Sequence, residues 1–259
     1  MDTSTFPQAT VGPLHGLRIV EFAGIGPGPF AGMMLADMGA DVIVVDRAAD
    51  QEKAAKYPRA AMNRGKRSVA LDLKSEAGRA AAWDLIQSAD ALIEGFRPGV
   101  MERLGYGYET LHARYPRLIY GAVSGYGHTG PEAQKPAYDM VVQARGGVMS
   151  ITGEEGGPPV RVGASIGDIV AGMYLAQGVL AALYDREKTG LGAKVDVAML
   201  DAQLAIQEHS IALTTATGRA PGRTGARHPT ITPFSTYRAA DGFFVIAAGN
   251  DAMFEHLCK

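Results

Sequence analysis

The sequence predicts an α/β fold: a doubly wound, Rossmann-like parallel sheet in a large domain, followed by the start of a second, smaller α+β domain. Short apolar runs typical of buried strands alternate with helical patterns through most of the chain. This alternation indicates a parallel sheet with helices on both faces. From Gly218 to Pro233 the chain is rich in Gly, Arg, Pro and Thr, and a hairpin signal follows. We therefore expect a large domain over 1–205, a linker over 206–233 and the beginning of a small domain over 234–259.

The expected strands are short apolar runs bounded by turn residues, at 17–22, 41–46, 67–72, 89–94, 117–123 and 193–199. The expected helices lie between these runs or after the last of them, at 30–38, 75–88, 98–115, 165–188 and 201–217. Near the C-terminus, Phe234–Arg238 and Gly242–Ala247 predict a hairpin, and a further helix is expected to begin at Asp251.

Composition excludes several classes of protein. Of the 259 residues, 47% are apolar and 20% are charged, and the formal net charge is -2. These values exclude intrinsic disorder and a basic nucleic-acid-binding surface. Cys258 is the single cysteine, which excludes an intrachain disulfide and a cysteine-based zinc site and fits a reducing, cytoplasmic location. The hydrophobic pattern predicts neither a signal peptide nor a membrane anchor.

A glycine-rich turn follows the first expected strand. Gly24-Ile-Gly-Pro-Gly28 opens a helix, and Asp46 ends the second strand, which is the layout of a dinucleotide-binding unit. However, Pro29 stands where the third glycine of that motif belongs, and neither Pro27 nor Pro29 has a backbone N–H to bind a pyrophosphate. Taken alone the motif favours a tight turn, with a nicotinamide-dependent oxidoreductase as the alternative.

Cationic side chains gather before and after the expected strands. Asn63-Arg-Gly-Lys-Arg67 holds three cations in four residues, while Arg47 and Lys74 each follow a strand end, where α/β sheets place ligands. These positions suit a phosphorylated ligand. The alternative for 63–67 is a solvated basic turn.

The segment Ser165-Ile-Gly-Asp168 begins the longest expected helix. Its form is that of a capping box, so the pattern alone favours Asp168 as a helix-capping carboxylate. A second interpretation is a nucleophile, since the helix dipole keeps such a carboxylate ionised and neighbouring glycines let a substrate approach it. The six histidines show no metal-ligand spacing, and no metal site is expected.

Several segments together resemble the family III CoA-transferases, the group of formyl-CoA transferase and carnitine CoA-transferase, whose sister branch is α-methylacyl-CoA racemase. The resemblance covers nearly the whole chain and rests on the order and spacing of seven segments. They are Leu17-Arg-Ile-Val-Glu-Phe-Ala-Gly-Ile-Gly-Pro-Gly-Pro29, Leu35-Ala-Asp-Met-Gly-Ala-Asp-Val-Ile43, Asn63-Arg-Gly-Lys-Arg-Ser68, Glu94-Gly-Phe-Arg-Pro-Gly99, Ser124-Gly-Tyr-Gly-His-Thr-Gly-Pro131, Tyr138-Asp139 and Gly167-Asp168.

The resemblance implies an acyl-CoA:carboxylate CoA-transferase in which Asp168 is the catalytic nucleophile. The reaction would run through an aspartyl anhydride and an aspartyl-CoA thioester, with CoA as co-substrate and no permanently bound cofactor. The resemblance also implies contacts to CoA, from Ile25, Gly26, Pro27, Arg47, Leu71, Lys74, Gly95, Phe96, Arg103 and Leu104. Tyr138 would bind the substrate. The implied partners are an acyl-CoA, a small carboxylic acid and a second copy of the chain in an interlocked homodimer, with neither nucleic acid nor a membrane.

The racemase branch shares the fold and the CoA site, and it remains an alternative. It would need a histidine where this chain has Tyr138-Asp139, and its distal glutamate position falls at Asp251. A non-catalytic CoA-binding protein is a further alternative. Family members usually continue well beyond the point that Lys259 matches, so we expect the chain to be a fragment or an abbreviated member.

Overall fold

The structure is a computed structural model that describes residues 12–22, 24–47 and 61–259. The chain divides into two compact units. The first comprises Met1–Val142 and Ser165–Gln203, and the second comprises Gln143–Ala164 and Leu204–Lys259. The N-terminal residues 1–11, on which part of the signal-peptide expectation rests, lie outside the described residues.

The first unit is built on a six-stranded parallel sheet. Its strands are β1 (Arg18–Phe22), β2 (Asp41–Arg47), β3 (Arg67–Leu71), β4 (Ala91–Glu94), β5 (Ile119–Ser124) and β6 (Lys194–Ala198). They lie in the order β3-β2-β1-β4-β5-β6, and Ile19 pairs with Val42 on one side and Ala91 on the other. The predicted Rossmann-like α/β class is therefore confirmed. The order reverses between β1 and β4, and ligands of such sheets bind beyond the carboxyl ends of the strands at this point.

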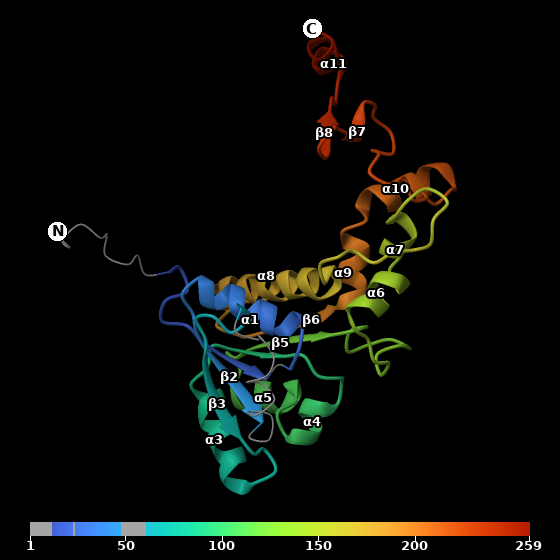
Figure 1. The fold of residues 1–259 in the computed structure, drawn as a ribbon. Helices are drawn as coiled ribbons and strands as arrows, with labels where there is room; N and C mark the ends of the chain where they lie inside the picture. Colours follow the sequence, from blue (N-terminus) through green and yellow to red (C-terminus); the bar gives the residue numbers. More distant parts are fainter. Residues whose placement is uncertain (1–11, 23, 48–60) are drawn as a thin grey trace, which may run out of the picture. The chain divides into compact units, whose positions relative to one another are not determined.

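Helices cover both faces of this sheet (Figure 1). The helices α1 (Pro27–Asp37) and α8 (Ile166–Thr189) lie on one face, and α3 (Glu76–Gln87), α4 (Val100–Leu104) and α5 (Tyr108–Arg114) lie on the other. The expected single helix over 98–115 is wrong, because the chain breaks at Gly105, which has a φ of 87°. A side chain rarely adopts this conformation, so glycine ends α4 there.

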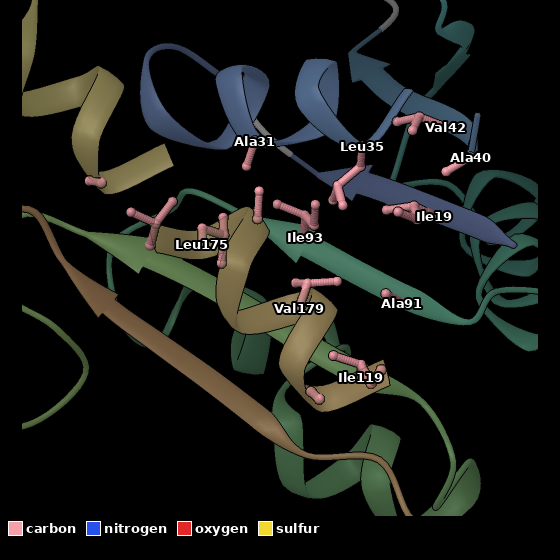
Figure 2. Packing of buried hydrophobic residues seen from close by; sticks show 14 of the residues in the cluster. Ile19, Ala31, Leu35, Ala40, Val42, Ala91, Ile93, Ile119, Leu175 and Val179 are labelled. Carbon is pink, nitrogen blue, oxygen red and sulfur yellow. The ribbon is translucent and has the colours of Figure 1, made fainter. Parts of the chain in front are cut away.

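Two apolar clusters fill the space between helices and sheet. Figure 2 shows Ile19, Ile93, Leu175 and Val179 in the cluster under α1 and α8, where all four are fully buried. Their chain neighbours on β1 and β4, including Val20, point to the opposite face and join the second cluster. Successive strand residues face opposite sides, so strands that are buried on both faces read as continuous apolar runs.

The helix α8 is the one helix in the described part of the chain that is long and apolar enough to cross a membrane, with a mean hydropathy of 1.6. Half of that apolar stretch is buried inside the structure. Its buried residues pack on α1, β5 and β6. A core helix of an α/β unit passes the same test, so this helix is weak support for a membrane span.

The second unit contains helices and the hairpin. Its helices include α7 (Val148–Ile151), α10 (Glu208–Thr217) and α11 (Asp251–Leu257), while α6 (Asp139–Arg145) and α9 (Met199–Ala205) run across the boundaries between the units. The strands β7 (Phe234–Arg238) and β8 (Phe243–Ala247) pair antiparallel, as the turn signal predicts.

The unit boundaries differ from the predicted domains at 143–164, which the prediction placed in the large domain. Hydrogen bonds hold this segment in the second unit: the Gln207 side chain donates to the Gly146 carbonyl at 2.6 Å, and the Gly225 N–H donates to the Gly153 carbonyl at 2.9 Å. The range 206–233 also contains the helix α10. These contacts join segments far apart in sequence, which local composition does not report.

The helices α1 and α8 pack too closely at Gly172 to accommodate a side chain, and a substitution there tests this close packing. A Cβ at Gly172 would lie 2.7 Å from the Pro27 carbonyl oxygen and 3.0 Å from Phe30. Gly172→Ala gains about 1 kcal/mol of helix propensity but forces an overlap that costs about 1–3 kcal/mol. We expect a lower melting temperature by calorimetry. Gly242→Ala, where nothing lies within 4 Å of the added Cβ, is the control. A Gly172→Ala protein that melts higher than the parent would contradict the close contact.

Candidate active site

A cavity of about 320 Å³ lies in the first unit, where the loops after β1, β4 and β5 meet the first turn of α8. This is the reversal point of the sheet, where α/β proteins bind ligands. The lining comes from loop and helix-end residues: 24, 25, 27, 95–98, 123–125, 133, 135–138, Asp168 and Met199. The cavity therefore collects segments that are spread over most of the first unit.

Asp168 lies in the first turn of α8, and its carboxyl group lines the cavity. The capping-box interpretation is wrong, because Ser165 makes no side-chain capping hydrogen bond. Asp139 takes that place, since its Oδ1 accepts a hydrogen bond from the Gly167 N–H at 2.8 Å. One free N–H group of the helix end is thus satisfied from another segment, and the Asp168 carboxyl is left for the cavity.

The environment of Asp168 disfavours its charged form. Burial raises the pKa of the carboxyl from its usual 3.8 to about 6, and the negative charge of Asp139 adds to the rise. A carboxylate that is poorly solvated and still ionised at neutral pH is a stronger nucleophile than one in water.

Gly26 brings the first loop directly against this carboxyl. Its φ is 81°, and a Cβ at this position would lie 2.9 Å from both Cγ and Oδ1 of Asp168. Only glycine meets both conditions without strain. Gly26 is the N-cap residue of α1 and Pro27 follows at the first helical position, where its fixed φ suits a helix start.

A second cavity, of about 590 Å³, lies beside the first in the same unit, and Phe96 lines both. Its lining is largely apolar, with Arg47 and Lys74 as the cations: Phe22, Val45, Asp46, Arg47, Leu71, Asp72, Leu73, Lys74, Phe96 and Leu104. An apolar slot with cations at its edge suits a flat heterocycle that carries phosphate groups.

The structure brings together most of the sequence-predicted site residues. Ile25, Pro27, Gly95, Phe96 and Tyr138 line the first cavity with Asp168, and Arg47, Leu71, Lys74 and Leu104 line the second. Gly26 and Arg103 are not among the lining residues. Gly26 packs against Asp168, while an Arg103 guanidinium nitrogen lies 3.2 Å from the position of a Cβ on Gly99.

The cations of 63–67 are already paired with carboxylates, so the structure does not support a phosphate site there. The Arg64 guanidinium binds Asp37 at 2.5 Å and that of Arg67 binds Asp41 at 2.6 Å, both at the surface. Lys66 binds Glu21 at 2.7 Å, with only 1% of either side chain exposed. The alternative of a solvated turn therefore agrees with the exposed Arg64 and Arg67 but not with the buried Lys66. A glutamate inside the apolar run 17–22 was the signal in the sequence for a buried pair.

A polar cluster next to the first cavity was also missed by the sequence patterns. Glu94 Oε2 accepts a 2.7 Å hydrogen bond from the Phe96 N–H, and Glu94 Oε1 lies 3.3 Å from His128 Nε2. The backbone N–H of His128 donates to the Asp196 carboxylate, and Lys194 Nζ lies 3.2 Å from the ring nitrogen Nδ1 of His128. This cluster anchors the turn after β4 and the glycine-rich loop after β5, which both line the cavity.

The model of the family described as CoA-transferase family III matches residues 14–259. The chain belongs to this family. The assignment confirms the resemblance and favours a CoA-transferase over the nicotinamide oxidoreductase alternative. No cluster of metal-ligating side chains occurs among residues 12–22, 24–47 and 61–259.

Named relatives and a solved structure agree with the assignment. The chain is 43% identical to acetyl-CoA:oxalate CoA-transferase of Acetobacter aceti, with 99% of this chain and 68% of the relative covered. It is 40% identical to succinate–glutarate CoA-transferase of Agrobacterium fabrum, with 95% and 66% covered. A CAIB/BAIF family protein from Brucella suis superposes with a TM-score of 0.88 and 38% identity, over 96% of this chain and 69% of that one. The chain thus spans about two thirds of the length of these proteins.

Burial of Asp168 predicts a pH-dependent cost to stability. The pKa of Asp168 is higher in the folded state than the value of 3.8 expected in the unfolded chain. The protonated carboxyl therefore contributes its full stability below pH 3.8, and this contribution is lost as the pH rises through about 6. The shift corresponds to about 3 kcal/mol at most, which we reduce to about 1–2 kcal/mol because the side chain is partly exposed. We expect Asp168→Asn to raise the free energy of unfolding by this amount near pH 8, measured by urea denaturation.

The gain should fade as pH falls below about 4, where the carboxyl is protonated in both states. Asp201→Asn, at an exposed first-turn aspartate of α9, is the matched control. An Asp168→Asn gain that persisted unchanged at low pH would mean that burial of charge is not its cause.

Proposed function

We propose that this chain transfers CoA from an acyl-CoA to a free carboxylic acid, with Asp168 as the nucleophile. The observation that carries the proposal is the placement of a partly desolvated carboxyl of raised pKa in one cavity, beside a larger apolar cavity with cations at its edge. CoA-transferase names among the relatives support the same reaction type. For the substrates we propose small dicarboxylic acids, because oxalate, succinate and glutarate occur in those names.

The first half of the reaction separates the acyl group from CoA. A carboxylate oxygen of Asp168 attacks the thioester carbonyl carbon, and the C–S bond breaks to give a mixed anhydride and the CoA thiolate. The thiolate then attacks the carbonyl carbon of the Asp168 side chain. The donor leaves as a free carboxylate, and an aspartyl-CoA thioester remains.

The second half repeats these steps in reverse with the acceptor. The acceptor carboxylate attacks the aspartyl thioester carbon and releases the thiolate, which then attacks the acceptor carbonyl of the new anhydride. The new acyl-CoA forms and the Asp168 carboxylate is regenerated. One thioester is consumed and one is made, so no ATP is needed, provided that water does not reach the anhydride. Apolar lining by Pro27, Phe96, Val123 and Met199 supports this exclusion.

The proposed contacts to CoA divide between the cavities. The apolar second cavity would take the adenine, with Arg47 and Lys74 near its phosphates, and Phe96 would lie between the nucleotide and the thioester end. Tyr138, a residue that is 72% exposed, would stand at the open side of the first cavity, where the acid enters. The homodimer and the cytoplasmic location stay predictions.

The covalent step can be tested by peptide mapping. After incubation with succinyl-CoA, mass spectrometry should show a CoA-sized adduct, or its hydroxylamine-trapped product, on the peptide that contains Asp168. Asp168→Ala should abolish the adduct, whereas Asp201→Ala should leave it unchanged. Measurable CoA binding with no adduct in the unaltered protein would overturn the proposed mechanism.

The pH dependence of acylation tests the role of Asp139. Because only the ionised carboxylate attacks, the single-turnover rate should rise about tenfold per pH unit below about pH 6 and level off above it. Asp139→Asn keeps an oxygen for the Gly167 N–H but removes the charge that raises the pKa of Asp168. The acidic limb should therefore move to lower pH. A limb that stays in place would show that Asp139 does not influence this titration.

A further inference from the structure

The side chain of Lys66 is buried, unlike those of the other two cations in the segment 63–67. Its ammonium lies 2.7 Å from Glu21 Oε2, and both side chains are 1% exposed, whereas Arg64 and Arg67 of the same motif are at the surface. A buried ion pair often contributes nothing to stability compared with apolar side chains of the same size, because both charges are desolvated. The burial of this pair therefore calls for a reason other than stability.

The ammonium of Lys66 also binds the beginning of α1. Lys66 Nζ donates to the carbonyl oxygen of Pro29 at 2.9 Å. Gly32, one turn further along α1, makes room for the pair, since a Cβ there would overlap Glu21 Oε2 and lie 3.1 Å from Lys66 Nζ. The lysine thus links strand β1, which contains Glu21, to the first turn of the helix.

The same turn meets Asp168 on its other side. The Phe30 N–H donates to the Gly26 carbonyl at 3.1 Å, so Gly26 and Pro29 belong to one turn. Gly26 lies against the Asp168 carboxyl, and Gly172 of α8 lies against the Pro27 carbonyl. The backbone between Lys66 and Asp168 is therefore a single turn of three to four residues.

We propose that Lys66 is a positioning residue for Asp168: it fixes the Gly26–Pro29 turn through the Pro29 carbonyl, and this turn holds the Asp168 carboxyl in its reactive position. The proposal rests on the proposed role of Asp168. Glycine at 26 and 28 leaves this turn free at two positions, and the prolines at 27 and 29 fix their own φ angles but offer no N–H through which the turn could be held. An additional anchor matters because a displacement of about 1 Å at a reacting group costs about 100-fold in rate.

The test compares Lys66→Met with Arg64→Met and Arg67→Met, which remove the two surface cations of the same motif. Burial already raises the pKa of Glu21 to about 7, so without Lys66 this group takes up a proton and no unpaired charge stays in the core. We expect Lys66→Met to slow adduct formation at Asp168 about 10- to 100-fold, with CoA affinity changed less than about threefold. The two controls should stay within about twofold of the parent.

A double variant separates positioning from stability. Glu21→Gln with Lys66→Met removes the cost of protonating Glu21 and should restore much of any lost melting temperature, but it cannot restore the bond to the Pro29 carbonyl. The slow acylation should therefore persist. A rate that recovers together with the melting temperature would show a purely structural role and overturn the proposal.

Hydrogen exchange provides a measurement that does not depend on activity. Amides of the peptide covering 26–33 should exchange faster in Lys66→Met and remain as in the parent in the two arginine variants. Unchanged exchange would overturn the proposal. If the unaltered protein forms no adduct, the proposed function fails, and the exchange data alone decide whether Lys66 holds the turn.

Discussion

The close approach of α1 to α8 is the contact on which the site depends. At Gly26 and at Gly172, an added Cβ would lie within 3 Å of atoms of the facing helix. The first turns of the two helices are therefore in direct contact. The contact brings the loop after β1 to the carboxyl group of Asp168. Because both helices also pack on the same face of the sheet, the position of this loop follows from the core below it.

Besides Asp139, three buried or half-buried carboxyl groups belong to the site or its support, and their surroundings separate their roles. Glu21 is paired with Lys66, and Glu94 accepts a hydrogen bond from the Phe96 N–H. Both groups hold backbone segments that line the cavity or support it. In the described part of the chain the structure shows no hydrogen bond to the oxygens of Asp168, and the charge that shifts its pKa is the like charge of Asp139. Asp168 is thus the carboxyl that is free to react.

The sequence was informative where a pattern is local. Periodicity predicted all six strands of the sheet, and the family resemblance implied roles in the site for Asp168 and Gly26, which the structure brings into contact. The cap from Asp139 to Gly167 joins residues 28 apart, and the bond from Lys66 to Pro29 joins residues 37 apart. No local rule relates such pairs, because they meet only after the sheet has formed. The break at Gly105 was also missed, since helical periodicity continues across it.

At the start of α8, the burial of Asp168 lowers the stability of the fold at neutral pH and makes the carboxylate more reactive. An aspartate in a first helical turn usually accepts backbone hydrogen bonds, which lower its pKa and make its oxygens weaker nucleophiles. Here the Asp139 carboxylate accepts the hydrogen bond from the Gly167 N–H instead, so Asp168 keeps its lone pairs. The same carboxylate then raises the pKa of Asp168 by its charge. Since that pKa of about 6 still lies below neutral pH, Asp168 stays ionised and becomes more nucleophilic, and the fold bears the cost of its desolvation.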